Sequence, residues 1–231
     1  MENFNKNVFV NCPFDADYRQ LLLSVVFTIK YLGYIPRLSL ERVNSAESRI
    51  SKIVNLINES KFGIHDLSRI ISSDKDEHFR MNMPFELGID YGAKVLKEGI
   101  WSSKQILILE EEKYRYQKAL SDLSGSDIKN HNNEPSLAVK AVRDWFFVTE
   151  DISADSGNKI WAKFNEFNAY LYDQAVEKDG HDSVDDLQVI EVIRHIDTWL
   201  TQLSSESSQT ATAKNVTSRR LEYTGSARPT I

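Results

Sequence analysis

Glu86 is the residue of the chain whose type and position are best suited to chemistry. It lies near the start of a helix predicted over residues 81–94. There, Pro84 is typical of a first helical residue, because proline has no N–H to leave unpaired. With Asn82 or Met83 as the N-cap, Glu86 falls in the first turn, where the helix dipole favours a negative charge. Such a carboxylate could stabilise positive charge on a substrate, or it could only be a well-placed helix starter.

Two further groups of polar residues follow predicted strands. Asp15 and Asp17 come after the β-rich run 7–14, and the run His65-Asp66-Leu67-Ser68 ends another apolar stretch. The first loop could contact a ribose or a phosphate, or it could serve only to cap the next helix. An aspartate at a strand end can hold a ribose hydroxyl or orient another side chain, although it commonly caps a turn.

A regular alternation of strands and helices must position these groups. Because this rhythm is typical of a parallel sheet covered by helices on both faces, we predict an α/β, flavodoxin-like fold. In such sheets the ligand crevice forms outside the carboxyl ends of the strands, where Asp15, Asp66 and Glu86 would all lie. The predicted strands span residues 7–14, 34–41, 61–68 and 104–110, and the predicted helices span 18–32, 44–57 and 81–94.

The chain changes character after Glu110. A polar segment is followed by aromatic-rich or apolar helical patterns over residues 135–147, 158–175 and 183–203. These helices need a partner surface, which is either the sheet or another copy of the chain. From residue 204 onward Ser, Thr, Ala and Gly predominate, which predicts a poorly ordered tail. We therefore expect an α/β domain over 1–150, a helical extension over 151–203 and a disordered tail over 204–231.

Composition argues against several classes of function. The 231 residues are 41% hydrophobic and 27% charged, as in soluble globular proteins, and the net charge of −6 gives no strong nucleic-acid signal. No apolar run is long enough to span a membrane, so no membrane partner is expected. A single cysteine, Cys12, and the lack of a secretory signal predict a cytoplasmic protein. Because Gly-rich phosphate loops and His/Cys metal spacing are both missing, we expect no metal and no bound cofactor.

Several motifs, taken in order, resemble those of the nucleoside 2-deoxyribosyltransferase-like proteins. The matching runs are Phe9-Val-Asn-Cys-Pro-Phe14, Gly63-Ile-His-Asp-Leu-Ser68, and Phe85-Glu-Leu-Gly-Ile-Asp-Tyr-Gly-Ala-Lys94 followed by Gln105-Ile-Leu-Ile-Leu109. That superfamily is close in fold to the TIR domains, and the resemblance covers roughly residues 7–110. Two features depart from the transferase pattern: the Gly-Thr step before Glu86 is missing, and Asp90 replaces a small residue. Asp90 could raise the pKa of Glu86 from the same helix face or simply face solvent.

The resemblance implies N-glycosidic bond chemistry on a nucleotide or nucleoside, with Glu86 as the catalytic residue. NAD is an easy substrate in this sense, because nicotinamide leaves as a neutral base and needs no general acid. A carboxylate beside C1′ could then stabilise the oxocarbenium-like sugar or attack it. The residues that could bind the substrate are Asp15, Asp66 and Ser68 for the ribose, Phe14, Tyr18 and Phe85 for a base, and Arg37 and Arg49 for phosphate.

The resemblance leaves three functions open. The leading hypothesis is a TIR-like NAD(+) glycohydrolase that acts as an antiphage defence effector and works as a homo-oligomer, with NAD as its substrate. The second is a module that binds a nucleotide signal without turnover, in which Glu86 holds the ligand. The third is a deoxyribosyltransferase-like N-glycosidase that acts on nucleosides or nucleotides.

Overall fold

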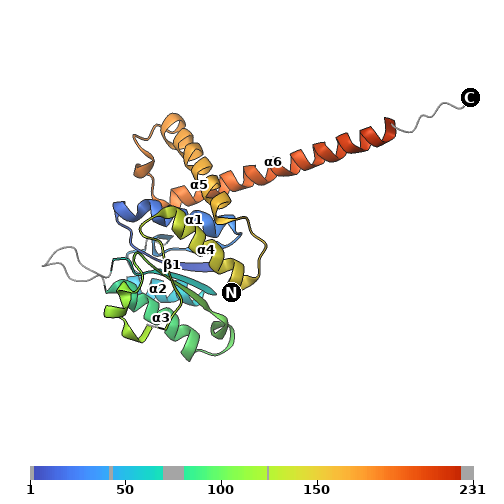
Figure 1. Ribbon diagram of the computed structural model, residues 1–231. Helices are drawn as coiled ribbons and strands as arrows, with labels where there is room; N and C mark the ends of the chain where they lie inside the picture. The colour runs from blue at the N-terminus through green and yellow to red at the C-terminus, as the bar shows by residue number, and fades with distance from the viewer. Residues whose placement is uncertain (1–2, 42–43, 70–80, 124, 225–231) are drawn as a thin grey trace, which may run out of the picture.

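The computed structural model describes residues 3–41, 44–69, 81–123 and 125–224, with side chains as far as residue 206. Its centre is a parallel five-stranded sheet in the order β2-β1-β3-β4-β5 (Figure 1). This confirms the predicted α/β, flavodoxin-like fold. The strands are β1 (Asn7–Asn11), β2 (Ile35–Arg37), β3 (Phe62–Asp66), β4 (Gln105–Glu110) and β5 (Ile128–Asn130).

The short edge strand β5 lies in the segment that was predicted to be only polar. It has three residues, Ile-Lys-Asn, of which one is apolar, so neither its length nor its composition predicts a strand. Pairing with the buried strand β4 forms it instead, with Ile128 opposite Ile108. The sheet is therefore one strand wider than the apolar runs of the sequence indicate.

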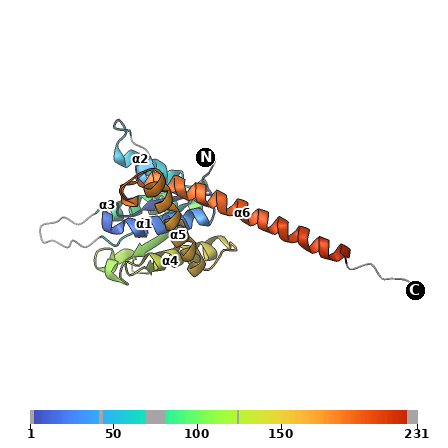
Figure 2. The ribbon, with the colours of Figure 1, turned by 90° about the horizontal axis from the view of Figure 1, so that it is seen from above.

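Helices cover both faces of the sheet (Figures 1 and 2). α1 and α4 pack together on one face, and α2 and α3 pack together on the other. The α-helices are α1 (Arg19–Tyr31), α2 (Arg49–Asn58), α3 (Asn82–Leu96), α4 (Pro135–Glu150), α5 (Gly157–Tyr172) and α6 (Val189–Thr224). The short helices are η1 (Ala16–Tyr18), η2 (Ser39–Glu41), η3 (Gly99–Ser103), η4 (Arg115–Lys118), η5 (Ser121–Leu123), η6 (Asp173–Lys178) and η7 (Val184–Asp186).

The larger core joins the sheet to the C-terminal helices. Phe27 of α1 is fully buried, and its ring centroid lies 5.4 Å from that of Phe164, 5.6 Å from Phe167 and 5.8 Å from Trp199. α5 and α6 thus form a further layer on α1 and share its core. α5 packs on α4 and α1, and α6 packs on α1 and α5. Side chains of both helices belong to the same hydrophobic cluster as side chains of β1, β3 and β4.

The last helix differs from the predicted tail. Composition predicted disorder over residues 204–231, but the backbone of α6 is helical as far as Thr224 and projects from the body (Figure 1). Ser and Thr lower helix propensity only slightly, and Ala favours a helix, so this composition permits a helix once one has started. The final residues, 225–231, lie outside the described part of the chain. No helix in the described part is both long and apolar enough to cross a membrane.

The start of α3 also differs from the prediction. The helix begins at Asn82, because the Phe85 N–H donates to the carbonyl of the N-cap, Met81, over 3.1 Å. The Met81 side chain makes no capping hydrogen bond. Pro84 is therefore the third helical residue, which proline tolerates because the first N–H groups of a helix have no partner within it. The prediction that Glu86 lies in the first turn is wrong, because Glu86 is the fifth residue of α3.

Candidate active site at the carboxyl edge of the sheet

The candidate site lies where the chain leaves β1 and β3 in opposite directions. These two strands are neighbours in the sheet, yet β1 leads to α1 on one face and β3 leads towards α3 on the other. Parallel sheets of this kind bind ligands at such a switch point, beyond the carboxyl ends of the two strands. Asn11 and Asp66 end these strands, and both side chains are buried.

Glu86 is a buried carboxylate beside the exposed side chain of Arg49. It is 5% exposed, and its Oε1 lies 3.6 Å from Nη2 of Arg49, the first residue of α2. Burial raises the pKa of Glu86, and the nearby guanidinium of Arg49 limits the rise. The Arg49 side chain is 59% exposed, so it can swing away from Glu86 without leaving solvent. The carboxylate of Glu86 is thus poorly solvated and loosely paired. Both properties suit a group that stabilises a positive charge during a reaction.

Asp66 is held by hydrogen bonds on both carboxylate oxygens. Oδ2 accepts from the Tyr18 hydroxyl over 2.5 Å and from His131 Nε2 over 2.9 Å, and Oδ1 accepts from the Ser68 N–H over 2.8 Å. Burial alone would raise the pKa of Asp66, but hydrogen bonds from His131, Ser68 and Tyr18 outweigh burial and lower it. Asp66 is 1% exposed, so in this structure it organises the floor of the site.

His131, Asp66 and Ser68 do not form a nucleophilic triad, although all three are in contact. The Asn133 N–H donates to His131 Nδ1 over 3.0 Å, which leaves the proton on Nε2. That same Nε2 contacts both Asp66 Oδ2 at 2.9 Å and Ser68 Oγ at 3.0 Å. A triad needs the serine and the aspartate on different ring nitrogens, so His131 acts here as a donor that holds Asp66. Sequence reasoning missed His131, since it follows the unpredicted strand β5.

A second buried network ties α3 to the sheet. Asn11 Nδ2 donates to the Met83 carbonyl and contacts His65 Nδ1, both over 3.0 Å. His65 Nε2 lies 2.9 Å from Asp90 Oδ2, and Asp90 Oδ1 lies 3.0 Å from Lys104 Nζ. Burial would raise the pKa of Asp90, but the His65 hydrogen bond and the charge of Lys104 outweigh it and lower the pKa. Asp90 therefore neither faces solvent nor carries a free charge towards Glu86, because it is committed to this network.

Gly63 makes this network possible. A Cβ at this position of β3 would lie 2.1 Å from Asp90 Oδ2 and 2.9 Å from His65 Nε2. Any larger residue would therefore push α3 away from the sheet. This close approach explains why a glycine stands inside a fully buried strand, where it would otherwise weaken the sheet.

Cys12, the residue after β1, has a buried thiol. Burial, followed by the negative charges of Asp66, Glu86 and Asp15, raises the pKa of the Cys12 thiol. The thiol therefore stays protonated and is unsuited to act as a nucleophile. Asp66, Glu86 and Asp15 are the carboxylates whose negative charges act on this thiol.

Among the remaining predicted substrate-binding residues, two have exposed side chains and two have buried side chains. Phe14, next to Asp15, is 37% exposed, and Phe85, next to Glu86, is 60% exposed, so both rings are accessible to a base. Tyr18 and Ser68 are buried at 1% and 6% and serve Asp66 instead.

Asp15 and Arg37 have structural partners of their own. Asp15 accepts from the Tyr18 N–H over 3.0 Å and lies 3.5 Å from Arg69 Nη2. Arg37 is bound by Glu41 over 2.9 Å and by Glu59 over 3.0 Å. β2 ends at Arg37, which lies opposite Phe9 in the middle of the longer strand β1.

No group of three or more His, Cys, Asp or Glu side chains in the described ranges is placed to hold a metal ion. Comparisons of the chain with protein-family models, with curated proteins and with solved structures returned no match. The candidate site is therefore defined by its own geometry: a buried glutamate beside an arginine, two exposed aromatic rings, and a hydrogen-bonded floor under the switch point.

Proposed function

We propose that the protein is an NAD(+) glycohydrolase that cleaves the bond between nicotinamide and ribose. The observation that carries this proposal is the state of Glu86, a carboxylate 5% exposed at the switch point of the sheet, with Arg49 3.6 Å away. In poorly solvated surroundings a negative charge stabilises a cation more strongly than it would in water.

The reaction needs few protein groups. The glycosidic bond from C1′ to the nicotinamide nitrogen breaks, and its electron pair leaves with neutral nicotinamide. The positive ribosyl group that remains is stabilised by the Glu86 carboxylate until water attacks C1′ and releases a proton. Phe14 and Phe85 are the exposed rings that could stack on the bases of the dinucleotide, and Arg49 could pair with its phosphates once it leaves Glu86.

Depletion of NAD would harm the cell that contains the enzyme, which is consistent with a cytoplasmic effector of antiphage defence. Such an effector must be inactive until it is triggered. The loose pairing of Arg49 with Glu86 supplies one way to hold it inactive, because a guanidinium beside this carboxylate competes with a cationic substrate group for it. Assembly into a homo-oligomer is part of this proposal.

The direct test is to incubate the full chain with NAD(+), with nucleotides and with deoxynucleosides, and to separate the products by chromatography. Free nicotinamide from NAD(+) supports the proposal. Free base from a nucleotide or a deoxynucleoside, with NAD(+) intact, assigns the site to the N-glycosidase alternative. Saturable binding of NAD(+) without any product, at the protein concentrations that favour assembly, assigns it to the alternative of a nucleotide-signal sensor.

A further inference from the structure

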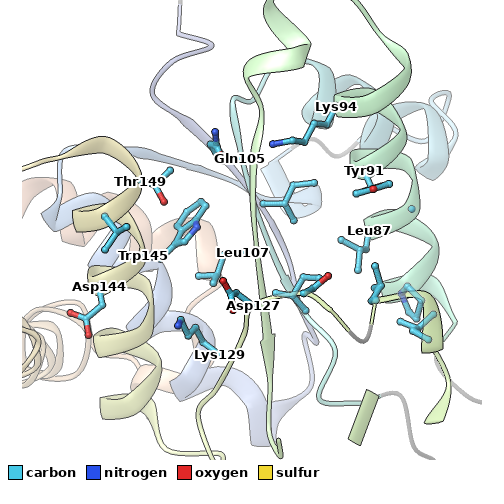
Figure 3. Close-up of a pocket in the computed structure, with 18 residues that line it drawn as sticks. Leu87, Tyr91, Lys94, Gln105, Leu107, Asp127, Lys129, Asp144, Trp145 and Thr149 are labelled. Atoms are coloured by element: carbon cyan, nitrogen blue, oxygen red, sulfur yellow. The ribbon is translucent and has the colours of Figure 1, made fainter. Parts of the chain in front are cut away.

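A groove of about 730 Å³ runs along the edge of β4, on a different face of α3 from Glu86. β5 pairs only with the second half of β4, from Ile108 onward, so no strand of the described chain lies beside Gln105 to Leu107 on this side. Figure 3 shows β4 between the two helices, with Leu87 and Tyr91 of α3 on one side and Trp145 and Thr149 of α4 on the other. The groove is thus apolar above and below the plane of the sheet.

One backbone position is open at this edge. The Gln105 N–H donates to the Lys61 carbonyl over 2.9 Å, so residue 105 faces β3 and the alternation of the strand turns the N–H and C=O of Ile106 outward. The outward positions on either side are occupied, because the Lys104 carbonyl accepts from Lys94 Nζ over 2.5 Å and Ile108 pairs with β5. A single donor beside a single acceptor is too short an edge for an added strand, but it matches the hydrogen-bonding edge of a nucleobase.

The far end of the groove carries three lysines and two aspartates, Asp127 and Asp144. A second groove of about 460 Å³ shares Ser126, Lys129 and Asp144 with the first and is also lined by Lys113 and Lys140. All three lysines are exposed, and within the described part of the chain no carboxylate pairs with them. Asp144 is already bound by Arg143 over 3.0 Å. In a chain of net charge −6, three unpaired lysines around one groove favour an anion, and phosphate is a common partner of lysine.

We propose that this continuous groove binds a nucleoside phosphate at a site separate from Glu86. The base lies at the edge of β4, hydrogen-bonded to the backbone of Ile106 between Tyr91 and Trp145, and the phosphates reach the lysines. Lys129 stands opposite Leu109, three residues along β4 from Ile106. At about 3.3 Å per residue this is a span of roughly 10 Å, which a ribose and its phosphates can bridge.

The test is a titration of the isotope-labelled full chain with ADP, GDP, CDP and UDP, followed by amide and indole NMR signals. We expect at least one diphosphate to shift the Ile106 amide and the Trp145 indole signals saturably. The matching nucleoside and ribose 5-phosphate, which each carry half of the recognised groups, should bind roughly tenfold more weakly or worse. No saturable shift with any of the four at millimolar concentration would overturn the proposal. So would equal binding of the free nucleoside, since the lysines would then contribute nothing.

Matched variants locate the site. Tyr91→Ser and the pair Lys129→Glu with Lys140→Glu should each weaken binding roughly tenfold. Leu96→Ser, which changes another exposed residue of α3, and Lys178→Glu, which reverses a remote charge, should leave it unchanged. Glu86→Gln should also leave nucleotide binding in the groove unchanged, so the binding result does not depend on whether the protein cleaves NAD(+).

Loss of nucleotide binding in Glu86→Gln alone would place the ligand at the Glu86 site and contradict the proposal. Laurate, an apolar chain that ends in a carboxylate, is titrated for comparison. Tighter binding of laurate than of any nucleotide would contradict the proposal and assign the groove to an acyl anion.

Discussion

At Glu86, two opposing influences act on one carboxylate. Burial raises its pKa, whereas Arg49, 3.6 Å away, favours the ionised form. The proposed chemistry needs the ionised form, because a neutral carboxyl group cannot stabilise a cation. Arg49 therefore has two opposing roles in the proposed mechanism. It favours the ionised form of Glu86 in the resting protein, and it must move aside when the substrate binds.

The first prediction concerns the pH dependence of NAD(+) cleavage. Replacing Arg49 by Gln removes the charge that limits the rise of the Glu86 pKa in the free enzyme, so the acidic limb of the kcat/KM profile should move to higher pH. The matched control is Arg194→Gln, which removes an exposed arginine of α6 and should leave the profile in place. An acidic limb at the same pH in Arg49→Gln and in the unmodified protein would mean that Glu86 does not set it.

The second prediction concerns stability. Because the pKa of Glu86 is raised in the folded state, the folded protein holds the Glu86 proton more tightly than the unfolded chain does. The contribution of Glu86 is thus present at low pH and is lost as pH rises through the raised pKa. Glu86→Gln, which cannot ionise, should therefore unfold at a higher urea concentration than the unmodified protein at pH 7, and this gain should vanish below about pH 4. The exposed Glu98→Gln should show no such pH-dependent gain.

At the scale of elements, α3 is positioned by groups that the sequence does not mark as belonging together. Apolar periodicity predicted four of the five strands and the helices that cover the sheet, and the order of these elements led us to expect Glu86, Asp15 and Asp66 at one edge. It could not predict that Asp90 turns inward to His65 and Lys104, because an aspartate in an amphipathic helix usually faces solvent. Nor could it predict that Arg37 is paired with Glu41 and Glu59, since those contacts depend on where β2 ends.

The buried Asp90–Lys104 pair gives the third prediction. Both side chains are fully buried, so Asp90→Asn leaves the Lys104 ammonium without its counter-charge in the core. Breaking such a pair typically costs about 3–5 kcal/mol of unfolding free energy, which urea denaturation would measure. The comparison is Asp197→Asn, which removes the more exposed ion pair with Lys30 and should cost about 1 kcal/mol or less. Equal costs for the two substitutions would contradict the role given to the network.

At the scale of the whole molecule, α5 and α6 complete the core on α1. The rings of Phe164, Phe167 and Trp199 surround Phe27, and all of these contacts precede the projecting part of α6. The aromatic content of these helices predicted that they need a partner surface, but not which one, because a helical stripe packs equally well on the same chain or on another copy. The structure shows that the same chain supplies it.

The fourth prediction compares two truncations. Ending the chain after Glu150 removes α5 and α6 and uncovers Phe27, so this variant should lose its cooperative thermal unfolding transition or fail to fold. Ending it after Glu206 removes only residues beyond those core contacts, so the melting temperature should stay within a few degrees of the full chain. If the chain that ends after Glu150 melts as cooperatively as the full chain, the C-terminal helices form a separate unit.

The account as a whole depends on Glu86, and one comparison tests that most directly. Nicotinamide release from NAD(+) is measured at pH 7 with three purified proteins: the unmodified chain, Glu86→Gln, and the exposed control Glu98→Gln. We expect the unmodified chain and Glu98→Gln to release nicotinamide at the same rate. Glu86→Gln should be folded, should still bind NAD(+), and should be slower by roughly a hundredfold or more, as when a group that stabilises transition-state charge is removed. An equal rate in Glu86→Gln would contradict the central claim.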